Sequence, residues 1–299
     1  MSVKFEVLKK VVELSGFKKR FLQSGDVLLA EARKEAARVK IPRLSDPALD
    51  IRYKKFMGCD VVWFRHKERC DRASLFIIGG GMIKYPRPSS LKKALKIAKE
   101  TGIDLVVPYY PLCIDQSVRP AVVMLYCLYR QMLKRYPAEH VNVCGSSSGG
   151  CLALGLASYI NAAGEGVPQP GSMYLASPGT FLHTPEDLEL ARELSKKDIL
   201  MDWTYMETAR EFCTGEDTPE YMYIADQGDY HGLKDVYLCY GGDESLYAGC
   251  RMVKESLERD GVHVTLEVGD GLYHCYPFFP LVKEAQAGWD HMIEYLKKA

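Results

Sequence analysis

Short apolar runs and amphipathic segments alternate along most of the chain. From residue 73 onward, the strand-like runs lie at 73–78, 104–107, 141–144, 172–177, 236–240 and 262–268, and segments with helical spacing separate most of them. Strands that alternate with helices of ten or more residues predict βαβ units and a mostly parallel sheet. The predicted fold class is therefore α/β, with a central sheet flanked by helices.

The segment before residue 73 has a different pattern. Residues 51–56 and 60–65 are β-prone and flank Met57, Gly58 and Cys59, which predicts a hairpin. We expect this hairpin to add antiparallel strands at one edge of the sheet. The run at 73–78 is apolar throughout, as expected of a strand that is buried on both faces.

Two helical regions interrupt the alternation and set the predicted domain organisation. Residues 1–50 form an N-terminal helical arm that is expected to be part of a cap, and 179–234 form a helical cap insertion. The core comprises 51–178 and 235–299. The pattern leaves open whether the arm only packs on the domain or also covers a pocket. It also leaves open whether the aromatic residues of the insertion line a pocket or anchor the insertion; they are Trp203, Tyr221, Tyr223 and Tyr230.

Composition and charge exclude several classes of function. The 299 residues carry 39 basic and 39 acidic side chains, and this balance favours neither nucleic acid nor a membrane as a partner. The ten cysteines are scattered singly, without zinc spacing, so no metal is expected. The chain has no secretory h-region at its start and no apolar stretch approaching 18 residues, so we expect a cytoplasmic protein. A homo-oligomer is left open.

The strand-like run at 141–144 leads directly into the pattern Gly-x-Ser-x-Gly. Ser147 is its central residue, between Gly145 and Gly149, and a helix rich in small residues follows at once. A strand that meets a helix this abruptly holds the residue at the tip in a strained conformation, and glycines on either side allow the two elements to approach. We therefore predict that Ser147 is a nucleophile, although the same letters also occur in ordinary turns.

Two further residues follow strands at the expected edge of the sheet. Asp243 comes after the run at 236–240, and His274 comes in the loop after the run at 262–268. Catalytic groups in α/β sheets gather beyond the carboxyl ends of the strands. We predict that His274 is the general base and that Asp243 orients it. Glu244 follows the strand one residue later than the position expected for the orienting acid. Asp270 is the second choice for that role. The other histidines lie in less suitable places; they are His66, His140, His183, His231, His263 and His291.

Three glycines follow the buried run at 73–78. Gly79, Gly80 and Gly81 expose backbone N–H groups without obstruction by side chains. An oxyanion hole needs such donors about 3 Å from the developing charge. The alternative is a plain flexible loop.

Together these motifs resemble the hormone-sensitive-lipase-like branch of the α/β-hydrolases, a family of carboxylesterases and lipases. The resemblance covers roughly residues 60–299 and includes the triple glycine, the Ser147 elbow, the segment 242–247 and the segment 272–280. The order of nucleophile, acid and histidine along the chain is also that of the fold. The resemblance implies a cap built from the N-terminal helices and the insertion. It further implies oxyanion donors from the backbone of Gly79, Gly80 and Ser148.

The sequence departs from the family pattern at three positions. Ile78 stands where the family has a histidine before the glycines, Ser146 stands where an acid is usual, and Ser148 stands where alanine is usual. Because the oxyanion donors are backbone groups, Ile78 need not abolish activity. It would instead change the support of the loop, the rate or the acyl preference.

The resulting expectation is a serine carboxylesterase that hydrolyses small to medium acyl esters through an acyl-enzyme, with no metal or organic cofactor. Two alternatives use the same fold. One is a non-catalytic binder of small molecules, and the other is a different acyl-transfer enzyme such as an amidase, a formamidase or an acyltransferase.

Overall fold

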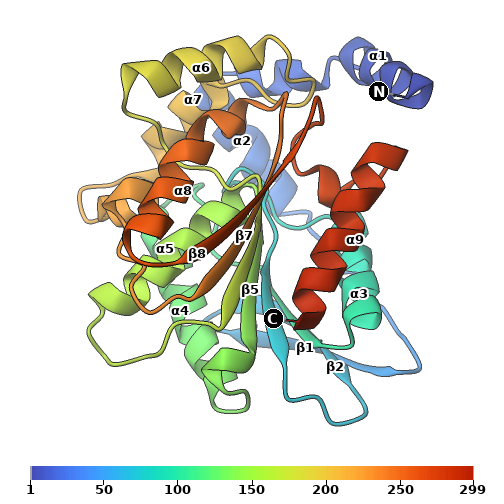
Figure 1. Cartoon of the computed structure of the whole chain (residues 1–299), viewed down its shortest axis with the longest axis vertical. Coiled ribbons are helices and arrows are strands. Elements are labelled where there is room, and N and C mark those ends of the chain that lie inside the picture. Colours follow the sequence, from blue (N-terminus) through green and yellow to red (C-terminus); the bar gives the residue numbers. More distant parts are fainter. Residues whose placement is uncertain (1, 299) are drawn as a thin grey trace.

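The computed structural model describes residues 2–298 and contains one eight-stranded sheet (Figure 1). Its strands are β1 (Leu49–Phe56), β2 (Cys59–His66), β3 (Ala73–Ile77), β4 (Asp104–Pro108), β5 (Val141–Ser146), β6 (Ser172–Ala176), β7 (Asp235–Gly241) and β8 (His263–Gly269), in the spatial order β1-β2-β4-β3-β5-β6-β7-β8. The predicted hairpin is present, since β1 pairs antiparallel with β2, and β2 pairs antiparallel with β4. The other pairs are parallel.

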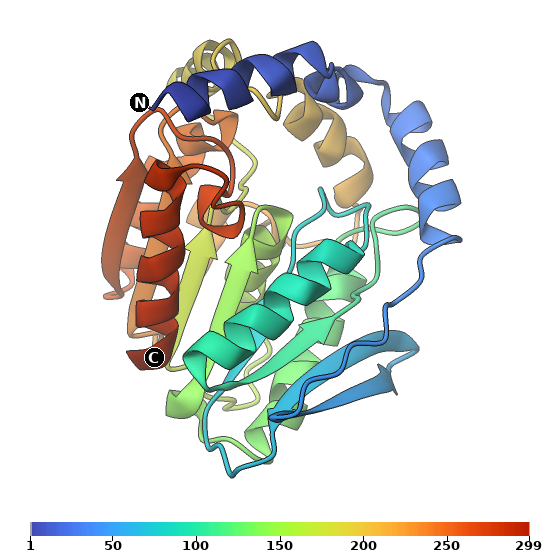
Figure 2. The same ribbon diagram turned by 90° about the vertical axis from the view of Figure 1, so that its right-hand side faces the viewer.

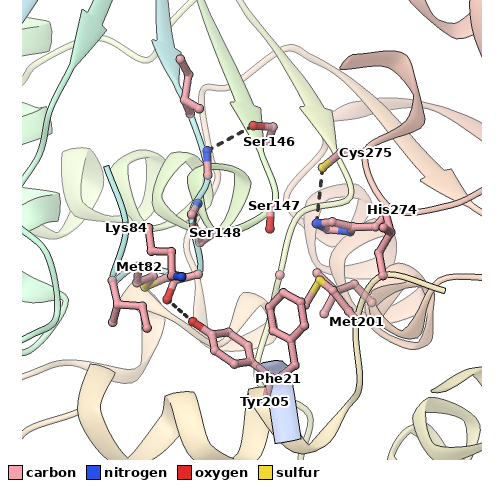
Figure 3. A pocket seen from close by; sticks show the side chains of 18 of the residues that line it. Phe21, Met82, Lys84, Ser146, Ser147, Ser148, Met201, Tyr205, His274 and Cys275 are labelled. Atoms are coloured by element: carbon pink, nitrogen blue, oxygen red, sulfur yellow. Dashed lines mark hydrogen bonds between the residues drawn. The ribbon is translucent and has the colours of Figure 1, made fainter. Parts of the chain in front are cut away.

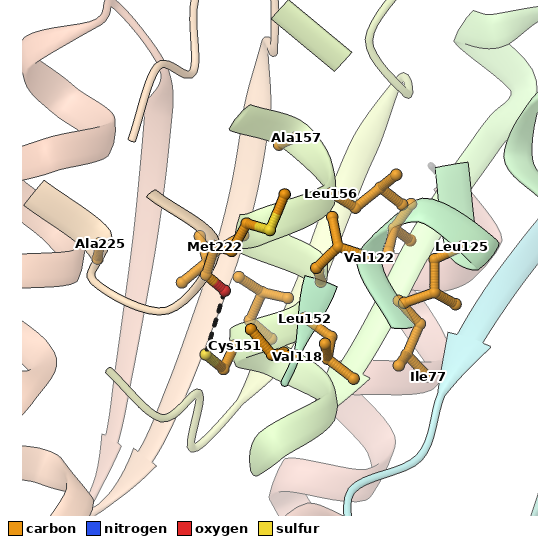
Figure 4. Close-up of a cluster of buried hydrophobic side chains, with 14 of the residues drawn as sticks. Ile77, Val118, Val122, Leu125, Cys151, Leu152, Leu156, Ala157, Met222 and Ala225 are labelled. Atoms are coloured by element: carbon orange, nitrogen blue, oxygen red, sulfur yellow. Dashed lines mark hydrogen bonds between the residues drawn. The ribbon is translucent and has the colours of Figure 1, made fainter. Parts of the chain in front are cut away.

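Helices cover both faces of this sheet. On one face, α3 (Pro88–Thr101) and α9 (Lys283–Lys298) pack in a cluster that includes Phe76 and Tyr174. On the other face lie α4 (Arg119–Leu133), α5 (Ser148–Ala162) and α8 (Cys250–Arg259), whose buried side chains form the larger cluster (Figure 4). Every residue of β3, β4, β5 and β6 is buried, because helices shield both sides. The predicted α/β class is confirmed.

The remaining α-helices and the first 3₁₀ helix lie beyond the carboxyl ends of the parallel strands (Figures 1 and 2). They come from two distant parts of the chain. The first part contains α1 (Val3–Leu14), the 3₁₀ helix η1 (Phe17–Leu22) and α2 (Gly25–Ala36), and the second contains α6 (Pro185–Ser195) and α7 (Thr204–Cys213). Contacts of α2 and η1 with α7 join the two parts. These helices thus cover the edge of the sheet at which the parallel strands end.

The helical segment between β7 and β8 begins with a tighter turn. A 3₁₀ helix, η5 (Ser245–Gly249), comes first, and α8 begins only at Cys250. The tighter turn brings Gly249 so close to Thr180 that a Cβ on the glycine would lie 2.7 Å from the threonine Cγ2. None of the described helices is long and apolar enough to cross a membrane.

Candidate active site

Ser147 lies at the tip of a sharp turn between β5 and α5. Its backbone has φ 54° and ψ −128°, a region that costs a non-glycine residue about 1–3 kcal/mol. Close packing around the turn requires glycine. A Cβ on Gly145 would lie 2.7 Å from the carbonyl oxygen of Gly149, and a Cβ on Gly149 would lie 2.0 Å from that of Ile77. The strained tip inferred from the sequence is therefore present.

His274 is held by a buried glutamate. Its Nδ1 lies 2.5 Å from Oε2 of Glu244, whose side chain has no exposed surface. The second carboxylate oxygen, Oε1, accepts a hydrogen bond of 3.0 Å from the backbone N–H of Gly241. Both oxygens are thus engaged, and the arrangement fixes the orientation of the imidazole ring.

This geometry corrects the predicted partner of His274, because Asp243 does not contact the histidine. The carboxylate of Asp243 points toward α1 and lies 3.5 Å from Nζ of Lys9. The chain turns at the end of β7, where the N–H of Glu244 donates to the carbonyl of Gly241 at 3.3 Å. This turn directs Glu244 inward and leaves Asp243 on the rim. The sequence placed both acids after the strand, and only the turn decides between them.

The other ring nitrogen of His274 faces the nucleophile side of the site. Its Nε2 lies 3.5 Å from Sγ of Cys275, and Figure 3 shows the ring beside the Ser147 hydroxyl. Within residues 2–298, the hydroxyl of Ser147 makes no hydrogen bond to another side chain or backbone group.

The pKa of His274 results from opposing effects. Burial disfavours the charged imidazolium and lowers the pKa, whereas Cys275 and Glu244 raise it by electrostatic interaction and hydrogen bonding. The net result is a pKa well above the usual 6.5 for histidine. Cys275 and Glu244 thus outweigh burial and stabilise the imidazolium relative to the neutral ring.

The first two glycines of the triple-glycine loop contact the elbow through serine hydroxyls. The N–H of Gly79 donates to Oγ of Ser146 at 3.2 Å, and the N–H of Gly80 donates to Oγ of Ser148 at 3.0 Å. The two serines that depart from the family pattern thus engage two of the expected oxyanion donors. Figure 3 shows Ser146 and Ser148 near Ser147.

Gly81 belongs to the predicted run of exposed N–H groups but not to the donors that the family resemblance implies, and its own N–H is available. Among the described residues, neither this group nor the N–H of Ser148 has a hydrogen-bond acceptor. Gly81 has φ 60°, and its carbonyl accepts a hydrogen bond of 2.6 Å from the hydroxyl of Tyr205 on α7. The third glycine of the run was the sequence signal for this conformation, because a positive φ favours glycine.

Ile78 occupies a buried position before these glycines. Its carbonyl accepts a hydrogen bond of 2.9 Å from the buried hydroxyl of Tyr110, and its side chain lines the cavity described next. Tyr110 therefore supports the loop at the point where the family pattern has a histidine.

A cavity of about 400 Å³ lies above the elbow. Its floor comes from the triple-glycine loop, the elbow and the histidine loop, and its roof comes from α1, η1, α2 and α7. The lining is mainly apolar and includes Leu8, Val12, Phe17, Phe21, Leu28, Met82, Met201, Tyr205 and Phe279. Some aromatic residues of the insertion line the cavity, and others anchor the insertion to the core. Tyr223 lines the cavity, whereas Trp203 and Tyr230 are buried in the core.

One group of possible metal ligands lies elsewhere on the described surface. Ligand atoms of Asp229, His231 and Asp260 lie within 4.8 Å of one another. Hydrogen bonds already engage the carboxylates, since Asp229 binds Asn161 and His231 while Asp260 binds Arg259. This arrangement stabilises the surface turn.

Residues 74–278 match a family described as the alpha/beta hydrolase fold. Because this match spans more than half of the chain, the protein belongs to that family. An acetyl-hydrolase of Streptomyces hygroscopicus is 21% identical over 301 residues, which cover 100% of this chain and 97% of that protein. A triacylglycerol lipase of Mycobacterium tuberculosis is 30% identical over 129 residues, which cover 43% of this chain and 29% of the lipase.

Solved structures show the same fold. EstE5, in a crystal soaked with p-nitrophenyl butyrate, superposes with a TM-score of 0.79 at 20% identity and covers 100% of this chain and 99% of its own. An esterase from the bacterial hormone-sensitive lipase family superposes with a TM-score of 0.74 at 21% identity. It covers 92% of this chain and 97% of its own. The predicted α/β-hydrolase fold is thus confirmed.

Proposed function

We propose that the protein is a serine carboxylesterase of the hormone-sensitive-lipase-like branch, acting on small to medium acyl esters. The observation that carries this proposal is the strained Ser147 beside His274, whose Nδ1 is held by the fully buried Glu244. A buried acid that orients a histidine next to a partly buried serine at the floor of a cavity is the arrangement that activates a hydroxyl as a nucleophile. The acetyl-hydrolase and lipase relatives, and the esterases of the same fold, support the choice of ester as substrate.

In the proposed reaction, Oγ of Ser147 attacks the ester carbonyl carbon while Nε2 of His274 accepts the hydroxyl proton. The resulting tetrahedral intermediate breaks its bond to the alcohol, and His274 returns the proton to the leaving oxygen. Water then attacks the acyl-enzyme with the same histidine as base, which releases the acid and restores the serine. Glu244 stabilises the imidazolium at both stages, because its carboxylate remains 2.5 Å from Nδ1.

The developing oxyanion is assigned to backbone donors. The N–H groups of Ser148 and Gly81 have no acceptor among the described residues and are therefore available. The N–H of Gly80 becomes available when the hydroxyl of Ser148 rotates away from it. Gly79 is assigned a supporting role, because its N–H is directed to Ser146 and a Cβ there would lie 2.3 Å from the carbonyl of Ser146.

We further assign residues 1–50 and 179–234 to a cap that encloses the substrate. Leu8, Phe21 and Tyr205 from these segments line the cavity together with the elbow. A mainly apolar cavity of about 400 Å³ fits an acyl chain of small or medium length. All ten cysteines are free thiols, which supports a reducing compartment such as the cytoplasm.

The test is a series of p-nitrophenyl esters from acetate to decanoate, with wild type and Ser147→Ala measured in parallel. We expect turnover that is greatest for short or medium chains, and a loss of kcat by about 10⁴-fold or more in the variant. Matched ester and amide substrates separate an esterase from an amidase. A wild-type protein that hydrolyses no member of the series and does not react with a fluorophosphonate would contradict the proposal and favour a non-catalytic binder.

A further inference from the structure

Three cations of the catalytic cavity, Arg20, Arg87 and Lys93, have no acidic partner among the described residues. Lys93 lies on α3 and lines the cavity, with Nζ 3.5 Å from the centroid of the Phe279 ring. Within the described part of the chain, no carboxylate forms an ion pair with it, whereas Lys96 and Lys99 on the same helix pair with Glu100 and Asp46. An ammonium kept partly away from water without a counter-ion is costly, and an anionic ligand would supply the missing counter-ion.

The charged side chains that line the cavity also favour an anionic ligand. Four cationic side chains line it, and Glu31 is the single acid among the described lining residues. The cations are Arg20, Lys84, Arg87 and Lys93. Because the chain as a whole is neutral, with 39 basic and 39 acidic side chains, this excess is local to the cavity. Lys84 pairs with Glu35 at 3.2 Å, so the other three cations are the ones available to attract an anion.

The position of Lys93 relates it to the reacting groups. It interacts electrostatically with Cys275, and Sγ of Cys275 lies 3.5 Å from Nε2 of His274. Burial lowers the pKa of Lys93 to about 8, so the side chain is mainly an ammonium at pH 7. Lys93, Cys275 and His274 thus line the same cavity.

We propose that Lys93 selects esters that carry a carboxylate, in either the acyl chain or the alcohol, and that it binds this carboxylate inside the catalytic cavity. The proposal rests on the esterase function above and names its substrate class. A single ammonium matches a monoanion, and the aromatic face of Phe279 holds the cation in place before the substrate arrives. The apolar remainder of the lining accepts the methylene groups of the same substrate.

The experiment compares two matched pairs of esters at pH 7. The acyl pair is the mono-4-nitrophenyl ester of adipate and 4-nitrophenyl heptanoate. The alcohol pair is 3-acetoxybenzoate and 3-methylphenyl acetate. We expect wild type to favour the charged member of one pair, and Lys93→Met to reduce that ratio of kcat/KM values by about 10-fold to 100-fold, as loss of a hydrogen bond to a charged group would. The effect should fall mainly on KM.

Two variants serve as controls. Lys93→Arg should retain the preference because it keeps the positive charge, and Lys92→Met should retain it because Lys92 is exposed and outside the cavity. The ratio should also fall as the pH rises through about 8, since the ammonium of Lys93 loses its proton there. Protonation of His274 cancels in this ratio, because both members of a pair use the same histidine.

Equal ratios in wild type and Lys93→Met for both pairs would overturn the proposal. Calorimetric binding of adipate against heptanoate separates this failure from a failure of the esterase function, because it needs no turnover. Tighter binding of adipate to wild type, lost in Lys93→Met, would support the carboxylate site even in an inactive protein. Equal binding of adipate by both proteins would overturn it.

Discussion

The floor and the roof of the catalytic cavity are built in different ways. The floor rests on strands that are buried throughout, and its acid, Glu244, has no exposed surface and two hydrogen-bonded oxygens. The roof helix α1 buries Phe5, while Val7, Val11 and Leu14 expose 56%, 58% and 87% of their surface. Few contacts tie this helix down, among them the stacking of Phe5 on Tyr273 and the Lys9–Asp243 ion pair.

This contrast separates two roles. Groups that must hold hydrogen-bond geometry lie on the floor, where dense packing over-determines their positions. Helix α1 contributes apolar surface to the cavity and has few buried side chains among those described, whereas α7 buries Tyr205, Ala209 and Cys213. Local opening of α1 should therefore cost much less free energy than global unfolding. We therefore expect floor substitutions to change kcat and roof substitutions to change KM and stability.

The largest effect is expected from the two neighbouring acids, because one belongs to the floor and the other to the rim. Glu244→Gln should lower kcat by about 10³-fold to 10⁴-fold, since the histidine loses its orienting carboxylate. Asp243→Asn is the matched control. It removes only the partly exposed pair with Lys9, so we expect a change in unfolding free energy of about 0–1 kcal/mol and nearly wild-type kcat. The reverse ranking in steady-state kinetics would contradict our assignment.

The pH profile tests the electrostatics of the floor. His274 must be neutral to accept the serine proton, and its pKa is raised well above the usual 6.5. Activity should therefore be lost as the pH falls through this raised pKa, by about tenfold per pH unit below it. The measurement is kcat/KM between pH 5 and 9. An acid limb with a midpoint at or below 6.5 would show that Glu244 and Cys275 do not outweigh the effect of burial.

An intermediate effect is expected where roof and floor meet. Tyr205→Phe removes the hydrogen bond from α7 to the carbonyl of Gly81 and leaves that acceptor without a partner. We expect a loss of about 1–3 kcal/mol of unfolding free energy in urea, and a several-fold rise in KM. Tyr223→Phe is the control, because Tyr223 lines the same cavity and its hydroxyl has no hydrogen bond within residues 2–298. Equal losses in the two variants would argue against a link through Gly81.

The smallest effect is expected from the hydroxyl of Ser148. Ser148→Ala frees the N–H of Gly80, which now donates to that hydroxyl at 3.0 Å. If Gly80 is an oxyanion donor, kcat/KM should rise by about 2-fold to 10-fold, which corresponds to one neutral hydrogen bond. A fall of similar size would show instead that the hydroxyl assists the reaction.

The elbow and the histidine could be inferred from the sequence because their signals are local. Ser147 lies between glycines at the junction of a strand and a helix, and His274 follows the last strand. The structure shows the expected close approach at both glycines and brings His274 beside the serine. The alternation of apolar runs likewise predicted the parallel strands.

The acid and the oxyanion loop depend on contacts that local spacing does not report. Asp243 and Glu244 follow the same strand, and the choice between them depends on a turn that closes onto Gly241. The bonds from Gly79 and Gly80 to the serines join residues that are 67 and 68 positions apart. The role of the N-terminal helices also depended on tertiary contacts, because α1 is apolar on its exposed side as well as toward the cavity.

The most direct test of the central claim is to map a fluorophosphonate adduct by peptide mass spectrometry. We expect one adduct on Ser147 in wild type, none in Ser147→Ala, and a rate reduced by several powers of ten in Glu244→Gln, whereas Asp243→Asn should react at nearly the wild-type rate. An adduct on Ser146, Ser148 or Cys275, or equal rates in the two acid variants, would contradict a site in which Glu244 orients His274 to activate Ser147.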